Sequence, residues 1–409
     1  MTDTERDEAH HLGGIRDELV RALEAGRHRH ATELAQKALG IAKDILKVTN
    51  GALDDEAAGV IRYIAFLQFM IGKNEVAKGI LEGFRLAPRG SISFYKNADT
   101  YPLTAEGGTL GNVAVDPSYW LVSDPATKTA YTGRTASFSF KIPNQHVWRN
   151  DDGTVLITEK PGARRLGQPV FLLGSKNNYK HWITDYLPRL KHYLDEGINL
   201  PVLMGEEMAR FQIDSLEMLG ISEEKIIRVA DSELLRCGAL QVGPVPRRMD
   251  HVEPWAMEWL ASAFSPRDTN GPDRVYISRC DARTRRVVNE EHVIQDLKDR
   301  GFETVTPGKL SFSEQLEVFA NARVVVGLHG AGLANIAFAR PDARLIEIIP
   351  ARNRETEIPS NTNGFARMAV ATNRRHQFFP ATSVDAEHFS KDSDVLVDTG
   401  ALIGLIERG

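Results

Sequence analysis

The feature that most constrains this fold is the regular alternation of strand-like and helix-like segments after residue 200. Apolar, β-branched runs such as PVLM, KIIRVA and DRVYISR are separated by segments with helical period, including EEMARFQIDSLEMLG and NEEHVIQDLKDRG. The two helices are predicted to end at Gly220 and Gly301, because glycine is favoured just past a helix terminus. Alternation of this kind predicts an α/β fold with parallel sheets.

The alternation comes in two runs, separated by the polar stretch PRDTNGPD at residues 266–273. The second run continues through the strand FETVTP, a helix over SFSEQLEVFANA that Ser311 or Ser313 caps, and the apolar strands ARVVVGLHG and ARLIEIIP. Two successive runs predict two doubly wound, Rossmann-like halves that face one another. Such folds bind ligands at the carboxyl ends of their strands, so we expect a site in the cleft between the halves.

The part of the chain before residue 200 shows a different pattern of apolar residues. Residues 1–90 show helical period, and Gly26 and Gly72 are each followed by alanine five residues later, a pattern typical of short turns between antiparallel helices. This repeated spacing indicates either a degenerate tetratricopeptide pair or an irregular helical cap. The next segment contains short strand-like runs, namely SISFY, YWLV, ASFSFKI, TVLITE and PVFLLG. We therefore predict three domains, over residues 1–90, 91–265 and 266–409.

Composition narrows the class of protein. Fifty Lys and Arg against 55 Asp and Glu leave a formal charge of -5, and 42% of the residues are hydrophobic, as in ordinary folded chains. This balance argues against nucleic-acid binding, which needs a broad basic surface. Cys237 and Cys280 stand far apart without a C-x-x-C partner, which predicts a reducing compartment and no cysteine-ligated zinc. With neither a leader-like start nor a long apolar run, a cytoplasmic protein without a transmembrane segment is expected.

The sharpest local motif is VVVGLHGAGLANIAFA, residues 324–339, where an apolar strand runs into His329, Gly330, Ala331 and Gly332. Small residues at a strand-to-helix turn let the backbone approach a ligand, and the N–H groups that open the helix favour an anion such as phosphate. The glycine spacing is G-x-x-G-x-G, and Asn335 stands where a dinucleotide fold would carry a third glycine. The motif therefore predicts a phosphate turn and disfavours NAD, although a turn needed only for packing stays open.

Charged residues near the strand ends extend this prediction. Five arginines lie between 274 and 286, and Arg279 follows Ser278 at the end of the strand VYIS, where a forked guanidinium could grip a diphosphate. Arg283 belongs to the same run, which could also be a solvated surface. We place Glu347 at the rim of the strand RLIEIIP, where it could accept hydrogen bonds from ribose hydroxyls or simply face solvent.

A possible acid–base pair lies in the first run. In NNYKHWITDYLPRL, His181 and Asp185 are four residues apart and therefore share one face of a helix. Paired in this way, the carboxylate can orient the imidazole, or either group can act as a general base toward a hydroxyl. A histidine packed in a core beside a local acidic partner is the alternative.

Taken in order, NYKHWITDYLPRL, VYISRCDARTRRVVNEE, LSFSEQLEVFANARVVVGLHGAGLANIAFA and LIEIIP resemble the family 61 glycosyltransferases, over about residues 165–350. The resemblance implies a GT-B fold and inverting transfer from a nucleotide sugar, usually a UDP-sugar, without a metal or other cofactor. Bacterial members are often labelled capsular polysaccharide biosynthesis proteins. A hydroxyl of a glycan or related molecule would be the acceptor of the hexosyl or pentosyl group. The residues matched on the donor side are Ser278, Arg279, Arg283, His329, Gly330, Ala331, Gly332, Asn335 and Glu347.

On the same resemblance, residues 91–265 form the acceptor-side domain, with His181 and Asp185 as catalytic residues, and residues 266–409 bind the nucleotide sugar. Residues 1–90 are outside the family core and could bind a protein partner. Three other functions stay open at this point. They are a nucleotide-sugar epimerase of the same architecture, an NAD-dependent oxidoreductase, and a non-catalytic scaffold that acts through its helical repeats.

Overall fold

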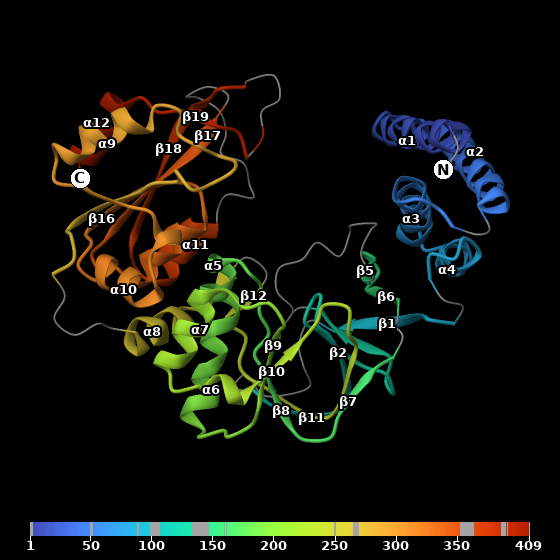
Figure 1. Cartoon of the computed structure of the whole chain (residues 1–409), viewed down its shortest axis with the longest axis horizontal. Helices are drawn as coiled ribbons and strands as arrows, with labels where there is room; N and C mark the ends of the chain where they lie inside the picture. The colour runs from blue at the N-terminus through green and yellow to red at the C-terminus, as the bar shows by residue number, and fades with distance from the viewer. Residues whose placement is uncertain are drawn as a thin grey trace. The chain divides into compact units, whose positions relative to one another are not determined.

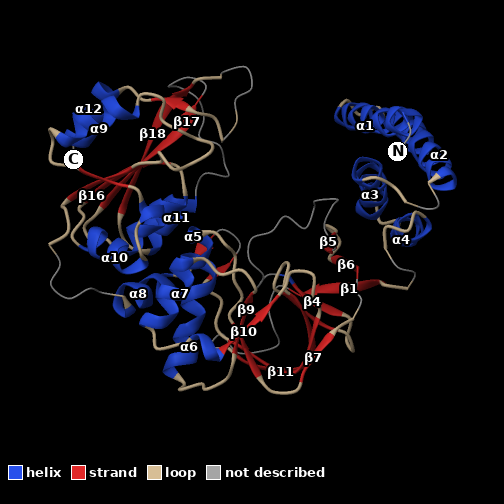
Figure 2. Cartoon of the chain, in the orientation of Figure 1, coloured by secondary structure: helices blue, strands red, loops and turns tan. Residues whose placement is uncertain are grey.

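The computed structural model contains both helices and strands (Figures 1 and 2), which confirms the α/β class. It describes residues 3–49, 52–87, 90–98, 107–132, 147–158, 160, 162–248, 251–264, 270–351, 364–385, 390 and 392–408. The chain divides into two compact units. Unit 1 comprises residues 1–101, 112–166 and 232–236, and unit 2 comprises residues 102–111, 167–231 and 237–409. Both boundaries expected from the sequence, after residues 90 and 265, fall inside a unit.

Unit 1 begins with the helices α1 (Asp3–Glu24), α2 (His28–Val48), α3 (Asp55–Met70) and α4 (Asn74–Gly83). They form two hairpins, α1 with α2 and α3 with α4. Gly26 and Gly72 stand at the two turns with positive φ angles of 68° and 77°. This left-handed conformation costs glycine little and ends a helix. The two turns predicted from these glycines are therefore confirmed, whereas the relation to tetratricopeptide repeats stays a prediction.

Unit 1 continues with strands, three of which share a hydrophobic cluster with these helices. The strands are β1 (Ile92–Ala98), β2 (Gly108–Asp116, of which residues 108–111 belong to unit 2), β3 (Leu121–Asp124), β4 (Thr129–Tyr131), β5 (Val147–Arg149), β6 (Thr154–Thr158) and β7 (Arg164–Leu166). Phe66 and Phe69 of α3 share a hydrophobic cluster with Trp148 of β5 and Leu156 of β6. Ile92 of β1 belongs to the same cluster, so apolar contacts connect the helices with these strands. The predicted strand ASFSFKI lies outside the described residues.

The first half of unit 2 is a parallel sheet with the order β10-β9-β8-β11. Its strands are β8 (Val170–Leu172), β9 (Val202–Gly205), β10 (Ile226–Val229) and β11 (Leu235–Val242). The helices are α5 (Tyr179–His181), a π-helical turn over Trp182–Tyr186, a 3-10 turn over Leu187–Arg189, α6 (Leu190–Asp195), α7 (Arg210–Met218) and α8 (Pro254–Ala263), and a short hairpin joins β12 (Arg247–Arg248) to β13 (His251–Val252). Numbered within this half, the strand order is 3-2-1-4, as in doubly wound nucleotide-binding sheets.

The second half of unit 2, orange to red in Figure 1, is a sheet with the order β15-β14-β16-β17-β18-β19 that is parallel except at β19. Its strands are β14 (Arg274–Ile277), β15 (Glu303–Val305), β16 (Val324–Leu328), β17 (Arg344–Ala351), β18 (Arg375–Ser383) and β19 (Val395–Leu396). The helices are α9 (Glu290–Lys298), η5 (Pro307–Lys309), α10 (Phe312–Ala320), η6 (Ala331–Phe338), α11 (Gly364–Ala371) and α12 (Thr399–Glu407). All residues of β17 are buried, as expected for a central parallel strand covered on both faces.

The two halves of unit 2 share a core. Phe264, at the end of α8, packs edge-on against Phe312 of α10 and Phe338 of η6, with ring centroids 5.1 and 6.2 Å apart. This contact places the end of α8 against the second half, although the helix follows the first half in sequence.

Within the described residues, we find no helix that combines the length and the apolar composition needed to cross a bilayer.

Candidate functional site

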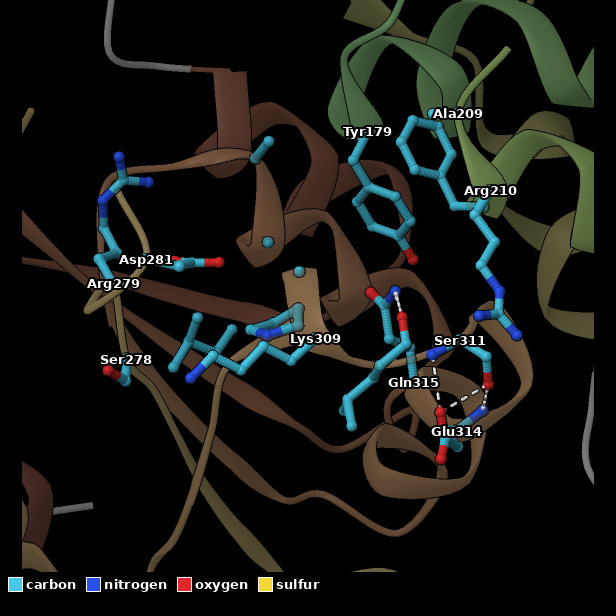
Figure 3. A pocket seen from close by; sticks show the side chains of 17 residues that line it. Tyr179, Ala209, Arg210, Ser278, Arg279, Asp281, Lys309, Ser311, Glu314 and Gln315 are labelled. Atoms are coloured by element: carbon cyan, nitrogen blue, oxygen red, sulfur yellow. Dashed lines mark hydrogen bonds between the residues drawn. The ribbon is translucent and has the colours of Figure 1, made fainter. Parts of the chain in front are cut away.

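A pocket of about 520 Å³ lies where the second sheet reverses its winding, at the carboxyl ends of β14, β15 and β16 (Figure 3). Counted within this half, the strand order of the first five strands is 2-1-3-4-5, so the reversal falls between β14 and β16. Ligands of doubly wound sheets bind at such a point, and the volume suits a ligand of nucleotide size. Its wall includes Ser278, Arg279, Asp281, Pro307, Gly308, Lys309, Ala331 and Gly332, together with Tyr179, Arg210 and Phe211 from the first half.

Arg279 is held in place by the loop that follows it. Its Nε donates to the carbonyl of Arg285 at 3.0 Å, and its Nη2 donates to the carbonyl of Thr284 at 3.2 Å. Burial lowers the pKa of the Arg279 guanidinium, and the charge of Arg285 lowers it further. An arginine whose pKa is lowered in this way gains from an anionic ligand, because the ligand would replace the lost hydration of the charge.

The glycine-rich turn predicted from the sequence borders the same pocket through Ala331 and Gly332. Gly330 has an extended backbone, with φ at −180°, so the glycine is not required by its φ angle. A Cβ at this position would lie 2.0 Å from Nη1 of Arg279, so any other residue here would displace the guanidinium. A Cβ at Gly332 would lie 3.3 Å from Pro307. The small residues therefore let the guanidinium and the turn meet at one wall.

The remaining residues predicted for the donor side divide into two groups. Ser278 is buried, lines the pocket and accepts a hydrogen bond from the backbone N–H of Cys280 at 3.2 Å. Arg283 is exposed and is not part of the pocket wall.

Asn335 is fully buried beneath the turn. Its side-chain amide donates to Gln315 at 2.9 Å and to the carbonyl of Gly332 at 3.1 Å, and its Oδ1 accepts from the hydroxyl of Tyr179 at 2.5 Å. This geometry speaks against the predicted donor contact of Asn335 and gives it a structural role between the two halves.

Glu347 requires a correction. It stands in the middle of β17 rather than at the strand's rim, and its exposed fraction is 0%. One carboxylate oxygen accepts a hydrogen bond from Nδ1 of His329, and the other accepts from Nε2 of His376 at 2.7 Å. Burial acts to raise the pKa of Glu347, but the hydrogen bonds from the two imidazoles outweigh it and lower this pKa. Both oxygens are therefore engaged within the protein, which argues against the predicted contact with ribose.

The alternation of side chains along β17 explains this placement. Ile346 and Ile348 point into the cluster formed with α9 and α12. Glu347 lies between them and therefore faces the opposite side of the sheet. On that side, the ring of Phe365 in α11 lies edge-on to His329 at 5.4 Å.

His181 and Asp185 form the hydrogen bond that their spacing predicted, with Nδ1 2.8 Å from Oδ2. Asp185 lies in the π-helical turn, and such turns recur at functional sites. Its Oδ1 accepts from the hydroxyl of Thr184 at 2.7 Å and lies 3.2 Å from Nη1 of Arg247. Burial acts to raise the pKa of Asp185, but the hydrogen bond from His181 and the charge of Arg247 outweigh it and lower this pKa.

The exposure of the two side chains differs in a way that bears on chemistry. The Asp185 side chain is 4% exposed, whereas that of His181 is 31% exposed. Since Nδ1 of His181 is engaged by Asp185, Nε2 is the ring nitrogen left for a ligand. A buried carboxylate behind an accessible imidazole is the arrangement that orients a histidine for proton transfer.

Three residues of this region were missed from the sequence: Lys180, Arg247 and His376. Lys180 interacts electrostatically with both Asp185 and Glu347, so the two carboxylates belong to one neighbourhood. We call the residues Lys180, His181, Asp185, Arg247, His329, Glu347 and His376 the charged cluster. The only sign of these residues in the sequence was that Lys180 directly precedes His181. Across the described ranges, we find no group of three His, Cys, Asp or Glu side chains arranged to hold a metal ion.

A family model described as Glycosyltransferase 61 matches residues 179–346, from α5 into β17. No curated protein matches the chain. Among solved structures, the bacterial iron-containing dodecameric glycosyltransferase TibC from enterotoxigenic E. coli H10407 aligns with 79% of this chain and 97% of that chain, at 13% identity and a TM-score of 0.30. That score is too low to establish a common fold. Residues 179–346 thus form a glycosyltransferase 61 domain, which confirms the resemblance in the sequence.

Proposed function

We propose that the protein is an inverting glycosyltransferase that moves a sugar from a UDP-sugar to a hydroxyl group of a glycan acceptor. The single observation that carries this proposal is the pocket at the winding reversal, where the Arg279 guanidinium and the turn at Ala331 and Gly332 share one wall within the glycosyltransferase 61 domain. A forked cation and the N–H groups of a helix start are the standard partners of a diphosphate.

We further propose the GT-B architecture for unit 2. Its support is the strand order, because each half has a parallel sheet whose winding reverses once, between β8 and β11 and between β14 and β16. The pocket takes wall residues from both halves, such as Tyr179 from the first and Ser278 from the second. The acceptor side is then the half with His181 and Asp185, and the donor side is the half with Arg279.

In the proposed mechanism, His181 removes the proton of the acceptor hydroxyl through Nε2. Asp185 holds the imidazole and stabilises the imidazolium that forms, an arrangement supported by their 2.8 Å hydrogen bond. The acceptor oxygen attacks the anomeric carbon on the face opposite the nucleotide, the bond to the diphosphate oxygen breaks, and the configuration inverts in one step. Arg279 stabilises the charge on the departing diphosphate without a metal ion.

Glu347 has a supporting role in this scheme. We propose that it fixes the ring of His329 beside the glycine turn, rather than binding ribose, because both of its oxygens accept from imidazoles. A role in polysaccharide biosynthesis, transfer of a hexosyl or pentosyl group, a cytoplasmic location, and a protein partner for the helices of residues 1–90 complete the proposal. The support for the polysaccharide role and the transferred group comes from the sequence resemblance, the support for the location comes from the cysteine usage and the lack of a long apolar run, and the partner is suggested by the helical pattern of residues 1–90.

The test compares two arginines of the same run. We expect Arg279→Ala to weaken UDP binding by roughly tenfold to a hundredfold, the loss of a charge-assisted contact, and Arg283→Ala to leave it unchanged. Isothermal titration with UDP measures both. Arg279→Lys keeps the charge but not the fork, so its intermediate affinity would show that the two-pronged contact matters. Equal UDP affinity in all three variants would remove the donor site from this pocket.

Product analysis separates the remaining functions. With a UDP-sugar alone, an epimerase would change the sugar, whereas the proposed transferase needs an acceptor. Binding of nicotinamide dinucleotide would instead favour an oxidoreductase. Loss of function on deletion of residues 1–90, together with an active Asp185→Asn variant, would favour a scaffold.

A further inference from the structure

Among the described residues, Lys180 is a cation with no carboxylate in ion-pair contact. Its side chain is partly buried on α5, and burial lowers the pKa of its ammonium group, with the charge of Arg247 lowering it further. Among the residues that the structure describes, no carboxylate lies within hydrogen-bonding distance of Nζ. Its ammonium group instead lies 4.9 Å from the centre of the Phe365 ring. A partly buried charge of this kind is costly until an anion pairs with it.

The two carboxylates that interact electrostatically with Lys180, Asp185 and Glu347, already have other partners. Asp185 accepts hydrogen bonds from His181 and Thr184 and pairs with Arg247. The two oxygens of Glu347 accept from two imidazoles. Arg247 and Arg367 both repel Lys180 electrostatically. The balance of charge around the ammonium group therefore favours an anion supplied from outside the protein.

The position of Lys180 indicates which anion this is. The Phe365 ring is shared by two residues, since Nζ of Lys180 lies 4.9 Å from its centre and the His329 ring lies edge-on to it at 5.4 Å, so the ammonium group lies in the neighbourhood of the glycine turn. The residue before Lys180, Tyr179, lines the pocket. The chain also makes room for the ammonium group, since a Cβ at Gly364 would lie 2.2 Å from Nζ.

We propose that Lys180 binds a phosphate group here, and that this phosphate belongs to the diphosphate of the sugar donor. The assignment to the donor rests on the proposed function, whereas the phosphate site itself does not. Lys180 would then hold the diphosphate from the acceptor-side half while Arg279 holds it from the donor-side half. Binding the donor would thereby join the two halves through one anion, and the repulsion among the cations would be relieved.

The experiment uses inorganic pyrophosphate, UDP and uridine as probes of the full-length protein by isothermal titration. Lys180→Met should weaken pyrophosphate and UDP by about tenfold or more and leave uridine unchanged, because uridine carries no phosphate. Lys180→Arg should retain most of the affinity. The matched control is Lys191→Met, since Lys191 lies in the same half but forms an exposed pair with Asp195. Melting temperatures show that the variants are folded.

The outcomes separate the two sources of phosphate. Weaker pyrophosphate binding with unchanged UDP binding would overturn the donor assignment and leave a phosphate carried by the acceptor. Unchanged binding of both probes in a folded Lys180→Met variant would overturn the phosphate site itself. If wild-type protein bound pyrophosphate through Lys180 but did not bind UDP, the proposed function would fail while the anion site stood.

Discussion

The charged cluster contains two histidine–carboxylate pairs that differ in how the chain builds them. His181 and Asp185 are four residues apart on one helical segment, and the histidine is partly exposed. His329 and Glu347 are 18 residues apart, on a loop and a central strand, and Glu347 is fully buried. The first pair leaves a ring nitrogen accessible, whereas the second pair anchors a loop from inside the sheet.

The two carboxylates, Asp185 and Glu347, also differ in the charge of their partners. Asp185 pairs with the permanent cation Arg247, so its negative charge is compensated whether or not His181 is protonated. Glu347 has two imidazoles as partners and, among the described residues, no permanent cation within ion-pair distance. The comparison suggests that the first pair suits proton transfer and the second suits positioning. Each of the following predictions tests that division.

The largest effect is expected at the first pair. Asp185→Asn should lower kcat by about 10²–10⁴-fold, because it removes the charge that orients His181 and stabilises the imidazolium. UDP affinity should stay nearly unchanged, since Arg279 and the glycine turn remain intact. Steady-state kinetics with saturating donor and UDP titration measure the two quantities.

The same pair offers a test of joint action. If Asp185 acts through His181, the double variant Asp185→Asn, His181→Ala should be no slower than His181→Ala alone. A multiplied loss in the double variant would instead mean that the two residues act independently. Weakened UDP binding with unchanged kcat in Asp185→Asn would contradict the catalytic role.

The second pair should affect stability more than turnover. Glu347→Gln removes the charge that both His329 and His376 contact, and we expect a loss of about 2 kcal/mol of unfolding free energy at pH 7. Because the folded state lowers the pKa of Glu347, this contribution is complete above the unfolded carboxyl pKa of about 4.3. It is lost as the pH falls through the lowered folded-state pKa.

Urea unfolding of wild type and Glu347→Gln at a series of pH values from 7 to 3 measures this effect. The difference between the two proteins should shrink at the acid end. A difference that grows as the pH falls would show that Glu347 is not held as a carboxylate by its neighbours. A loss of kcat as large as that of Asp185→Asn would remove the distinction between the pairs.

These two pairs also show what the sequence could predict. Several strands and helices of unit 2, such as β14, α10 and β16, follow from apolar periodicity, and the bond between His181 and Asp185 follows from helical geometry, since both signals are local. The glycine turn was predicted for the same reason. Ser311, one of the two caps predicted for α10, accepts from the backbone N–H of Glu314, whose side chain bonds back to Ser311.

The rest of the site depends on contacts that local patterns do not encode. Arg247 reaches Asp185 across 62 residues of chain, and His376 reaches Glu347 across 29. The position of Glu347 was mispredicted because β17 continues to Ala351, beyond the polar residue that seemed to end it. Asn335 was read as a donor contact, although its partners Tyr179 and Gln315 come from two other helices.

The smallest effect concerns the hydrogen bond between Tyr179 and Asn335, which joins the two halves of unit 2. Tyr179→Phe removes the hydroxyl that donates to buried Asn335, between the two halves of unit 2, and should cost about 1 kcal/mol of stability. Tyr193→Phe is the control, since its hydroxyl donates to the carbonyl of Leu200 within the first half alone. Both variants should lose similar stability in urea unfolding. Turnover should fall several-fold in Tyr179→Phe and stay unchanged in Tyr193→Phe, because misplacing one pair relative to the other slows the reaction. Equal turnover in the two variants would mean that the pairs do not act across the halves.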